Sequence, residues 1–291
     1  MSSNRWFEDQ EWALLEFRGA DRKDFLTRLT TNVLPSGESP LVHNFFLSVN
    51  AKIQAEFWVS NQGEYMALLA PKAQVKALKE CIDRYHFGEK IELSEPQGKL
   101  FVVAAADREV LEIATTVFLP DPRYGNGCAW CFVDSENLDS FSAGLGEPLD
   151  HTEAERMRIT TGRPKYGLDY DDESLFVEVA QQDDFSQSKG CYPGQEIVAR
   201  VLHRGRLNRH LRGFHSSSPV PQGWLLKVDG KEVAAVRSVV EDGEGGSFGY
   251  LMVRREFGKD GESLTGAGPD GKPVTLTVTP RPGEVLTGEE E

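Results

Sequence analysis

A change in the pattern of apolar residues near residue 209 constrains what this chain can fold into. Before this point, apolar runs of strand length alternate with stretches of helical spacing, which favours α+β structure. After it, short apolar runs are separated by Gly, Pro and Asp clusters, and no long helical pattern occurs. The short runs lie at 224–228, 232–236, 248–253 and 273–278. We therefore predict an α+β region over residues 1–209 and a small β-barrel over residues 210–291.

The first region combines strands and helices. Strand patterns lie at 12–17, 45–49, 53–59, 65–69, 100–105 and 129–133. Two helices are predicted from their first residues, with Asp21 as an N-cap and Pro71 at a first helical position. A third helix is predicted over 108–118. A capping box of Thr152 and Glu155 predicts a fourth helix, which ends near Gly162. This mixture predicts α+β lobes rather than a repeated βαβ unit.

Charge and cysteine content limit the classes of protein. The 291 residues carry 32 basic and 46 acidic side chains, a net charge of −14, which disfavours coating of nucleic acid through bulk electrostatics. Four cysteines in so long a chain do not form a disulfide framework, which favours a reducing compartment. The N-terminal sequence lacks the apolar core of a secretion signal, and no apolar run approaches the ~18 residues of a membrane span. We therefore expect a cytoplasmic protein with no membrane partner.

The octapeptide Lys189–Glu196 (KGCYPGQE) carries the most specific chemistry of the chain. Two glycines and a proline place Cys191 in a tight loop. The ammonium of Lys189 would favour the thiolate, which is the nucleophilic and metal-binding form of cysteine. The alternative is a buried cysteine in a structural turn. The chemistry of the octapeptide alone leaves both interpretations open.

Three segments of the chain resemble one protein family. The octapeptide resembles the K-G-C-Y-x-G-Q-E signature of the YgfZ family, folate-binding relatives of the glycine cleavage T-protein. Residues 19–33 resemble the family's N-terminal motif G-x-D-x-x-x-F-L…L-T-x-D-V, and residues 158–169 resemble its R-I-x-x-G-x-P-x-x-G-x-D motif. The likeness covers most of residues 10–210. The chain departs from the pattern at Asn32, where the family has Asp, and at Val177, near its usual Pro.

The resemblance implies a fold and a function. The expected fold is a three-lobed clover-leaf ring of the T-protein type, in which two intertwined α+β lobes and a C-terminal β-barrel surround a hole for tetrahydrofolate or a derivative. The expected function is that of a folate-binding accessory protein for the assembly or repair of iron–sulfur clusters in client enzymes, including those that modify tRNA. The alternatives are a folate-dependent aminomethyltransferase like the T-protein and a factor that contacts tRNA directly.

The resemblance also implies roles for particular residues. Cys191 would be a redox, sulfur-handling or iron-handling thiol that Lys189 tunes, and no resident metal is expected. The residues expected to contact folate are Glu178, Asn32, Arg158, Tyr192, Gln195 and Arg200. Glu178 would accept hydrogen bonds from the pterin, and the alternative for Glu178 is an exposed glutamate on an edge strand.

Residues 51–56 test the transferase alternative. They resemble a T-protein strand with an acidic pair, but this chain retains only Glu56. A transferase would therefore lack the carboxylate expected to perform general acid–base chemistry.

A stretch directly after the octapeptide concentrates positive charge. No acidic residue occurs from Ile197 to Val228, and the basic residues there are Arg200, Arg204, Arg206, Arg209, Arg212 and Lys227, with His203 and His210. Such a field could receive a polyglutamate folate tail, an acidic client protein or an RNA backbone. The alternative is that these arginines pair with Asp169–Glu173 and with Asp183 and Asp184.

Two further groups of residues favour structural roles. Cys128 and Cys131 form a C-x-x-C on a predicted strand, so their side chains point to opposite faces and are expected in the core. The acidic run Asp169–Glu173 matches no Ca²⁺-loop spacing and is expected to be a solvated loop.

Overall fold

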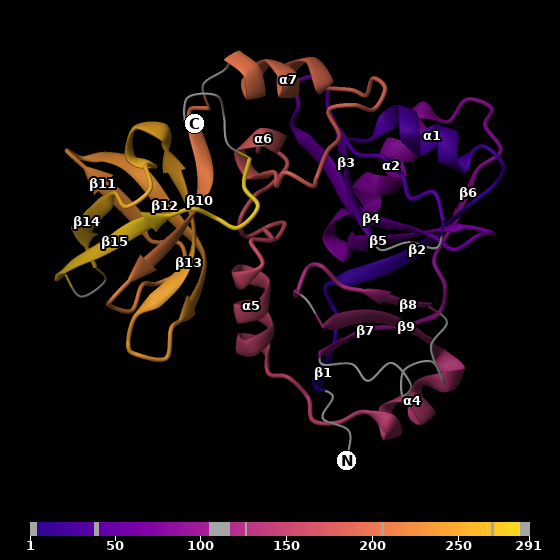
Figure 1. Cartoon of the computed structure of the whole chain (residues 1–291), viewed down its shortest axis with the longest axis horizontal. Helices are drawn as coiled ribbons and strands as arrows, with labels where there is room; N and C mark the ends of the chain where they lie inside the picture. Colours follow the sequence, from indigo (N-terminus) through magenta and orange to yellow (C-terminus); the bar gives the residue numbers. More distant parts are fainter. Residues whose placement is uncertain are drawn as a thin grey trace. The chain divides into compact units, whose positions relative to one another are not determined.

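The computed structural model describes residues 5–37, 41–104, 117–125, 127–204, 207–268 and 271–285. Within these ranges the strands form three antiparallel sheets, and short helices lie between some of the strands along the chain (Figure 1). The chain divides into two compact units. The first unit contains Met1–Val49, Ile53–Ala154 and Asp183–Gln195, and the second contains Asn50–Lys52, Glu155–Gln182 and Glu196–Glu291.

The first unit is built around a five-stranded sheet. Its strands are β2 (Trp12–Arg18), β3 (Val42–Leu47), β4 (Ile53–Asn61), β5 (Met66–Pro71) and β6 (Glu92–Ser94), in the order β3-β4-β5-β2-β6. Helices α1 (Arg22–Leu29) and α2 (Val75–Tyr85) pack on one face, where Phe17, Phe25 and Ile82 share a core. Alternate residues of the same strands, such as Leu14 and Trp58, face the other way, as the two-residue period of a strand requires.

A four-stranded sheet completes the first unit. Its strands are β1 (Arg5–Glu8), β7 (Gly98–Ala104), β8 (Val117–Pro120) and β9 (Cys128–Asp134), in the order β1-β7-β9-β8, followed by the short helices η2 (Ser135–Asn137) and α4 (Leu138–Gly144). Trp130 packs against the five-stranded sheet, and Cys131 packs against Phe141 of α4. Cys128 and Cys131 are both buried and free, as predicted.

The second unit holds a six-stranded sheet. Its strands are β10 (Arg209–Ser216), β11 (Leu225–Val228), β12 (Lys231–Glu241), β13 (Ser247–Arg254), β14 (Ser263–Ala267) and β15 (Pro273–Thr279), with η3 (Arg255–Phe257) after β13. The order is β11-β12-β13-β10-β15-β14, and the end strands β11 and β14 also contact one another. The sheet is therefore nearly closed around an apolar core, and the predicted barrel is confirmed.

The remaining helices are α5 (His151–Thr160), α6 (Phe176–Val179) and α7 (Gln195–Arg204), with η1 (Lys72–Gln74) ahead of α2. The expected boundary at residue 209 stays a prediction. Strand β10 begins there, while the second unit also includes residues N-terminal to it. None of the described helices is long and apolar enough to cross a bilayer.

The structure refines three local predictions. Asp21 is the N-cap residue of α1, as predicted, but its side chain makes no cap hydrogen bond, because its carboxylate accepts one from the backbone N–H of Lys90 at 2.7 Å. Pro71 ends strand β5 and is the N-cap residue of η1, one position before the predicted first helical position. The capping box of α5 is formed by Asp150 and Glu153, two residues earlier than the predicted pair. The predicted helix over 108–118 lies mostly outside the described residues, and its last two positions begin strand β8.

Candidate functional site: the cysteine loop

The cysteine loop, residues Asp183–Gln195 of the first unit, presents an exposed thiol. Cys191 is exposed, whereas the other three cysteines are buried. Gly194 adopts a left-handed backbone conformation (φ +83°) just before α7, which explains the glycine there. Gly190 has open space at its Cβ position and no such backbone requirement. The exposure of Cys191 favours the interpretation as a reactive thiol over a buried structural cysteine.

Lys189 anchors the cysteine loop to the end of α1. Its ammonium donates hydrogen bonds to the backbone carbonyls of Thr30 and, at 3.3 Å, Asn32, and lies 5.3 Å from the centre of the Tyr192 ring. Burial lowers the pKa of Lys189 to about 8. Among the described residues, no hydrogen bond joins Lys189 to the sulfur of Cys191. The contacts therefore give Lys189 a role in holding the loop, and its tuning of the thiol stays a prediction.

Asn32 fixes the first residues of the same loop. Its side-chain amide donates to the carbonyls of Asp183 at 2.6 Å and His43 at 3.1 Å, and its side-chain oxygen accepts from the N–H of Val33 at 2.8 Å. A carboxylate could not donate to those two carbonyls. This explains the departure from the Asp of the family motif. Because both amide hydrogens are used within the protein, the geometry gives Asn32 a structural role, and its contact with folate stays a prediction.

Tyr192 and Gln195 follow Cys191 in the cysteine loop. Tyr192 is 7% exposed, and burial raises the pKa of its phenol to about 12. Gln195 begins α7, and its backbone N–H donates to the carbonyl of Tyr192 at 3.2 Å. The two residues close the loop, while their contact with folate stays a prediction.

A buried histidine lies between two carboxylates, one of which belongs to the cysteine loop. Nδ1 of His43 lies 2.7 Å from Oδ1 of Asp184, and Nε2 lies 2.9 Å from Oε1 of Glu56. The His43 ring stacks on Trp58 with 4.1 Å between ring centres. All three ionisable side chains are buried. They come from β3, β4 and the start of the cysteine loop, so they join the loop to the five-stranded sheet.

The charge of His43 follows from these neighbours. Burial alone lowers the pKa of His43, but the charges of Asp184 and Glu56 and their hydrogen bonds outweigh it, so the pKa is raised. When both ring nitrogens are protonated, each donates to one carboxylate. The cues in the sequence are a histidine and a glutamate within two largely apolar strands, but the sequence alone does not bring them together.

Backbone contacts reinforce the same connection. The hydroxyl of Thr31 donates to the carbonyl of Asp184 at 2.8 Å, and the N–H of Ser186 donates to the carbonyl of Thr31 at 3.0 Å. The segment from Thr30 to Asn32 therefore contacts the cysteine loop at Asp183, Asp184, Ser186 and Lys189. The conformation that presents Cys191 depends on this segment.

Glu178, the predicted pterin acceptor, lies in the second unit. It is a buried residue of helix α6, so the alternative of an exposed edge-strand glutamate is wrong. Oε2 accepts hydrogen bonds at 3.2 Å from the N–H of Leu175 and from Nη2 of Arg209, and Oε1 accepts one at 3.2 Å from Nε of Arg209. Arg209 is partly exposed, with 42% of its side chain accessible.

Arg158 is a structural hub of the second unit. Its guanidinium donates to Glu155, to the carbonyl of Arg163, to Asp169 and to Ser238. These contacts use all five of its N–H groups within the protein, and the contact of Arg158 with folate stays a prediction. Asp169 is fully buried here, whereas Asp171, Asp172 and Glu173 are exposed, so only the later part of the acidic run is a solvated loop.

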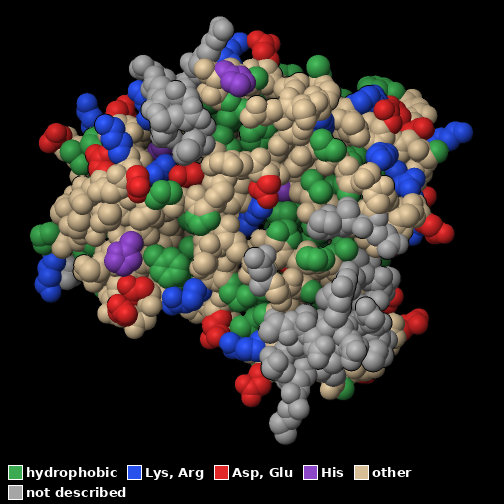
Figure 2. All heavy atoms as spheres, viewed as in Figure 1, with side chains coloured by type: hydrophobic (Ala, Val, Ile, Leu, Met, Phe, Trp, Pro, Cys, Tyr) green, Lys and Arg blue, Asp and Glu red, His purple; other side chains and the backbone are tan. Residues whose placement is uncertain are grey.

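The basic stretch after the cysteine loop is largely neutralised. Its ion pairs are Arg200–Glu196, Arg209–Glu178, Arg212–Glu284 and Lys227–Glu232. The alternative of paired arginines therefore holds, although the acidic partners differ from those predicted. Arg200 remains 65% exposed at its side chain. Arg206 lies outside the described residues, as does the side chain of Arg204. On the face seen in Figure 2, acidic and basic side chains are interspersed.

Comparison of the sequence with known proteins identifies several relatives. No family model matches the chain. The tRNA-modifying protein YgfZ of Yersinia enterocolitica is 22% identical over 94% of this chain and 90% of its own length, and that of Vibrio atlanticus is 24% identical over 69% and 67%. A chloroplastic protein of Arabidopsis thaliana named as a transferase is 31% identical, but over only 40% of this chain and 28% of its own length.

The fold has a solved counterpart. The aminomethyltransferase T of the glycine cleavage system from Bartonella henselae matches with a TM-score of 0.75 at 14% identity, covering 96% of this chain and 86% of that one. The prediction of a T-protein fold is therefore confirmed.

Proposed function

We propose that this chain, which is similar to YgfZ proteins over most of its length, is a cytoplasmic, folate-binding accessory protein that supports the assembly or repair of iron–sulfur clusters in client enzymes, including enzymes that modify tRNA. The observation that carries the proposal is the exposed thiol of Cys191 on a loop that buried contacts hold in place. The relatives named as tRNA-modifying proteins support the choice of clients.

Cys191 is the residue to which we assign the chemistry. A cysteine thiolate binds metal and attacks sulfur, and an exposed position gives a client access to it. An iron–sulfur cluster usually takes about four protein ligands. A single exposed cysteine therefore suits the handling of sulfur, iron or redox equivalents with a client, and the client supplies the other ligands.

Glu178 is the residue of the second unit that we assign to the pterin. Each carboxylate oxygen can accept two hydrogen bonds. Oε2 already accepts two, from Leu175 and Arg209, and Oε1 accepts one, from Arg209. A pterin that binds both oxygens must therefore displace the guanidinium of Arg209, whose partly exposed side chain has room to move. With that displacement the carboxylate fits a ring that presents neighbouring N–H donors.

Folate titration separates the ligand site from the thiol. We expect wild type, Cys191→Ser and the control Gln187→Ala, an exposed loop residue, to bind tetrahydrofolate equally. Glu178→Gln should bind roughly tenfold more weakly, because it loses a charged acceptor. In cells that lack the protein, only Cys191→Ser among the first three should fail to restore tRNA methylthiolation. Full restoration by Cys191→Ser would refute the role of the thiol.

The aminomethyltransferase alternative receives less support from the site. Glu56, the retained carboxylate of the acidic-pair strand, is 2% exposed and bonded to His43. A general acid or base must reach the reacting atoms, and Glu56 is held away from solvent. Turnover of methylenetetrahydrofolate with an aminomethyl donor, retained in Cys191→Ser, would favour the transferase instead.

A further inference from the structure

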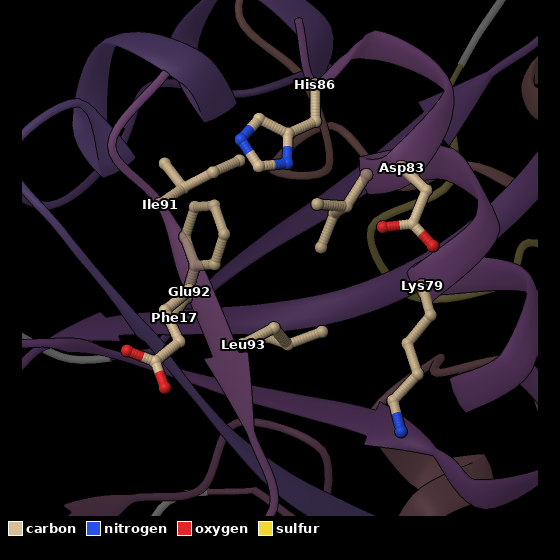
Figure 3. Close-up of a pocket in the computed structure, with 8 residues that line it drawn as sticks. Phe17, Lys79, Asp83, His86, Ile91, Glu92 and Leu93 are labelled. Atoms are coloured by element: carbon tan, nitrogen blue, oxygen red, sulfur yellow. The ribbon is translucent and has the colours of Figure 1, made fainter. Parts of the chain in front are cut away.

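A hollow of the first unit shares no residue with the cysteine loop or with the His43 contacts. It is a pocket of about 300 Å³ between the end of α2, strand β6 and Phe17 of β2, with the residues of its wall seen in Figure 3. The residues that line it are Phe17, Lys79, Ile82, Asp83, His86, Ile91, Glu92 and Leu93.

The floor of this pocket is apolar. Phe17 and Ile82 are buried members of the core beneath the five-stranded sheet, and Ile91 and Leu93 pack against that core while remaining partly exposed. An apolar side chain placed in the pocket would therefore extend the existing core and leave water.

The rim of the pocket carries uncompensated negative charge. Asp83 and Lys79 lie on one side and Glu92 on the other (Figure 3). Lys79 is already paired with Glu95. Asp83 and Glu92 are exposed, and neither carboxylate has a hydrogen-bond or ion-pair partner among the described residues. A cationic group is the complement of such a rim.

An exposed aromatic side chain stands next to the pocket. Phe87, directly after His86 of the pocket wall, is 87% exposed. Its loop is held by Glu89, which accepts hydrogen bonds from the N–H groups of Phe87 and Gly88 and from Arg28. An aromatic ring presented on a fixed loop suits binding of a partner, because little conformational freedom is lost on association.

We propose that this pocket, together with Phe87, is a docking site for a segment of a partner protein that carries a bulky apolar side chain beside a lysine or arginine. The apolar side chain would fill the pocket, and the cation would pair with Asp83 and Glu92. A second copy of this chain fits less well, because it would bring the same two carboxylates and a net charge of −14 against the site.

Peptide titration by NMR tests the site independently of folate and of Cys191. The probes are the acetylated, amidated tripeptides Lys-Trp-Lys, Glu-Trp-Glu and Lys-Ser-Lys. We expect Lys-Trp-Lys to shift resonances of Ile82, Ile91 and Leu93, and the other two to bind much more weakly. Asp83→Asn with Glu92→Gln should weaken Lys-Trp-Lys roughly tenfold. Glu80→Gln, which removes one exposed carboxylate of α2 outside the pocket, should not.

Three results would overturn the proposal. One is equal binding of the basic and acidic tryptophan peptides, which would remove the role of the rim. Another is a set of shifts that lie away from the pocket. The third is self-association of the protein that Phe87→Ser abolishes, which would make a second copy the occupant.

Discussion

The side-chain amide of Asn32 connects two parts of the first unit through groups that only an amide offers. It donates to the carbonyls of His43 and Asp183 while accepting from Val33. An aspartate would keep the accepted hydrogen bond, lose both donated ones and face two carbonyl oxygens with negative charge. The identity of this one residue therefore decides how firmly the cysteine loop is attached.

We predict that Asn32→Asp lowers the free energy of unfolding by about 1–3 kcal/mol, because two carbonyls lose their donor. Urea denaturation followed by circular dichroism measures the change. Asn61→Asp is the matched control, since among the described residues the side chain of Asn61 makes one hydrogen bond, which its oxygen accepts from the N–H of Gly63 at 3.1 Å. Equal stability of Asn32→Asp and wild type would contradict the role assigned to the amide.

The raised pKa of His43 predicts a pH dependence of stability. A histidine whose pKa is higher in the folded than in the unfolded state stabilises the fold fully below about pH 6.5, and this contribution falls as pH rises through the folded pKa. The slope for one proton is at most about 1.4 kcal/mol per pH unit. Lys189 acts oppositely, because its pKa is lowered to about 8. Burial of its ammonium therefore costs stability at low pH, and this cost falls as pH rises above about 8.

The difference between wild type and His43→Gln isolates the histidine, since both proteins retain Lys189. We expect the stability difference to shrink as pH rises above neutral. Because removal of the cation from between Glu56 and Asp184 can cost about 3–5 kcal/mol, a histidine NMR titration of wild type provides a second measurement. A His43 ring that loses its proton below about pH 6.5 would contradict the prediction.

At the scale of elements, the positions of several strands could be predicted from the sequence, whereas the side-chain contacts between distant segments could not. The apolar runs in 53–59, 248–253 and 273–278 correctly located β4, β13 and β15. Strand β10 was not predicted, because arginine and histidine residues, among them Arg212, interrupt its apolar pattern. The charge is tolerated since Glu284, far along the chain, pairs with Arg212 at 2.8 Å. Such compensation depends on tertiary structure and leaves no local pattern in the sequence.

The same limit explains why the His43 contacts were missed. Pairing of β3 with β4 places Glu56 opposite Phe45, two residues from His43, and the cysteine loop then adds Asp184 from far along the chain. The octapeptide, in contrast, is continuous in sequence. Its exposed cysteine was therefore within reach of motif analysis, whereas the contacts that hold it were not.

The end of helix α5 offers a sharp test of local packing. Gly162 has φ +81°, and a Cβ there would lie 2.0 Å from the carbonyl oxygen of Pro282. We predict that Gly162→Ala lowers the free energy of unfolding by more than about 2 kcal/mol, since strain and a clash with backbone add. Gly167→Ala, with φ +80° and open space, should cost only about 1 kcal/mol. Thermal or urea unfolding of both variants gives the comparison, and equal losses would contradict the packing argument.

At the scale of the whole molecule, the fold brings acidic partners to the described arginines of the basic stretch. The sequence shows the arginines after Ile197 without acidic neighbours, but the fold supplies them from elsewhere, as Glu178 and Glu284 do. A charge pattern along the chain therefore overstated the positive field that the folded protein presents.

We accordingly predict weak direct binding of tRNA. A protein that neutralises many phosphates shows an affinity that falls steeply with salt, and about six contacts lower it by roughly a thousandfold between 50 and 200 mM. Because the described arginines of this stretch are already paired, we expect a slope that corresponds to fewer than about three phosphates. Fluorescence anisotropy with labelled tRNA across this salt range measures the slope, and Arg200→Gln should barely change it. A steep slope, reduced by about one on removal of Arg200, would make tRNA itself a partner instead of only the substrate of a client enzyme.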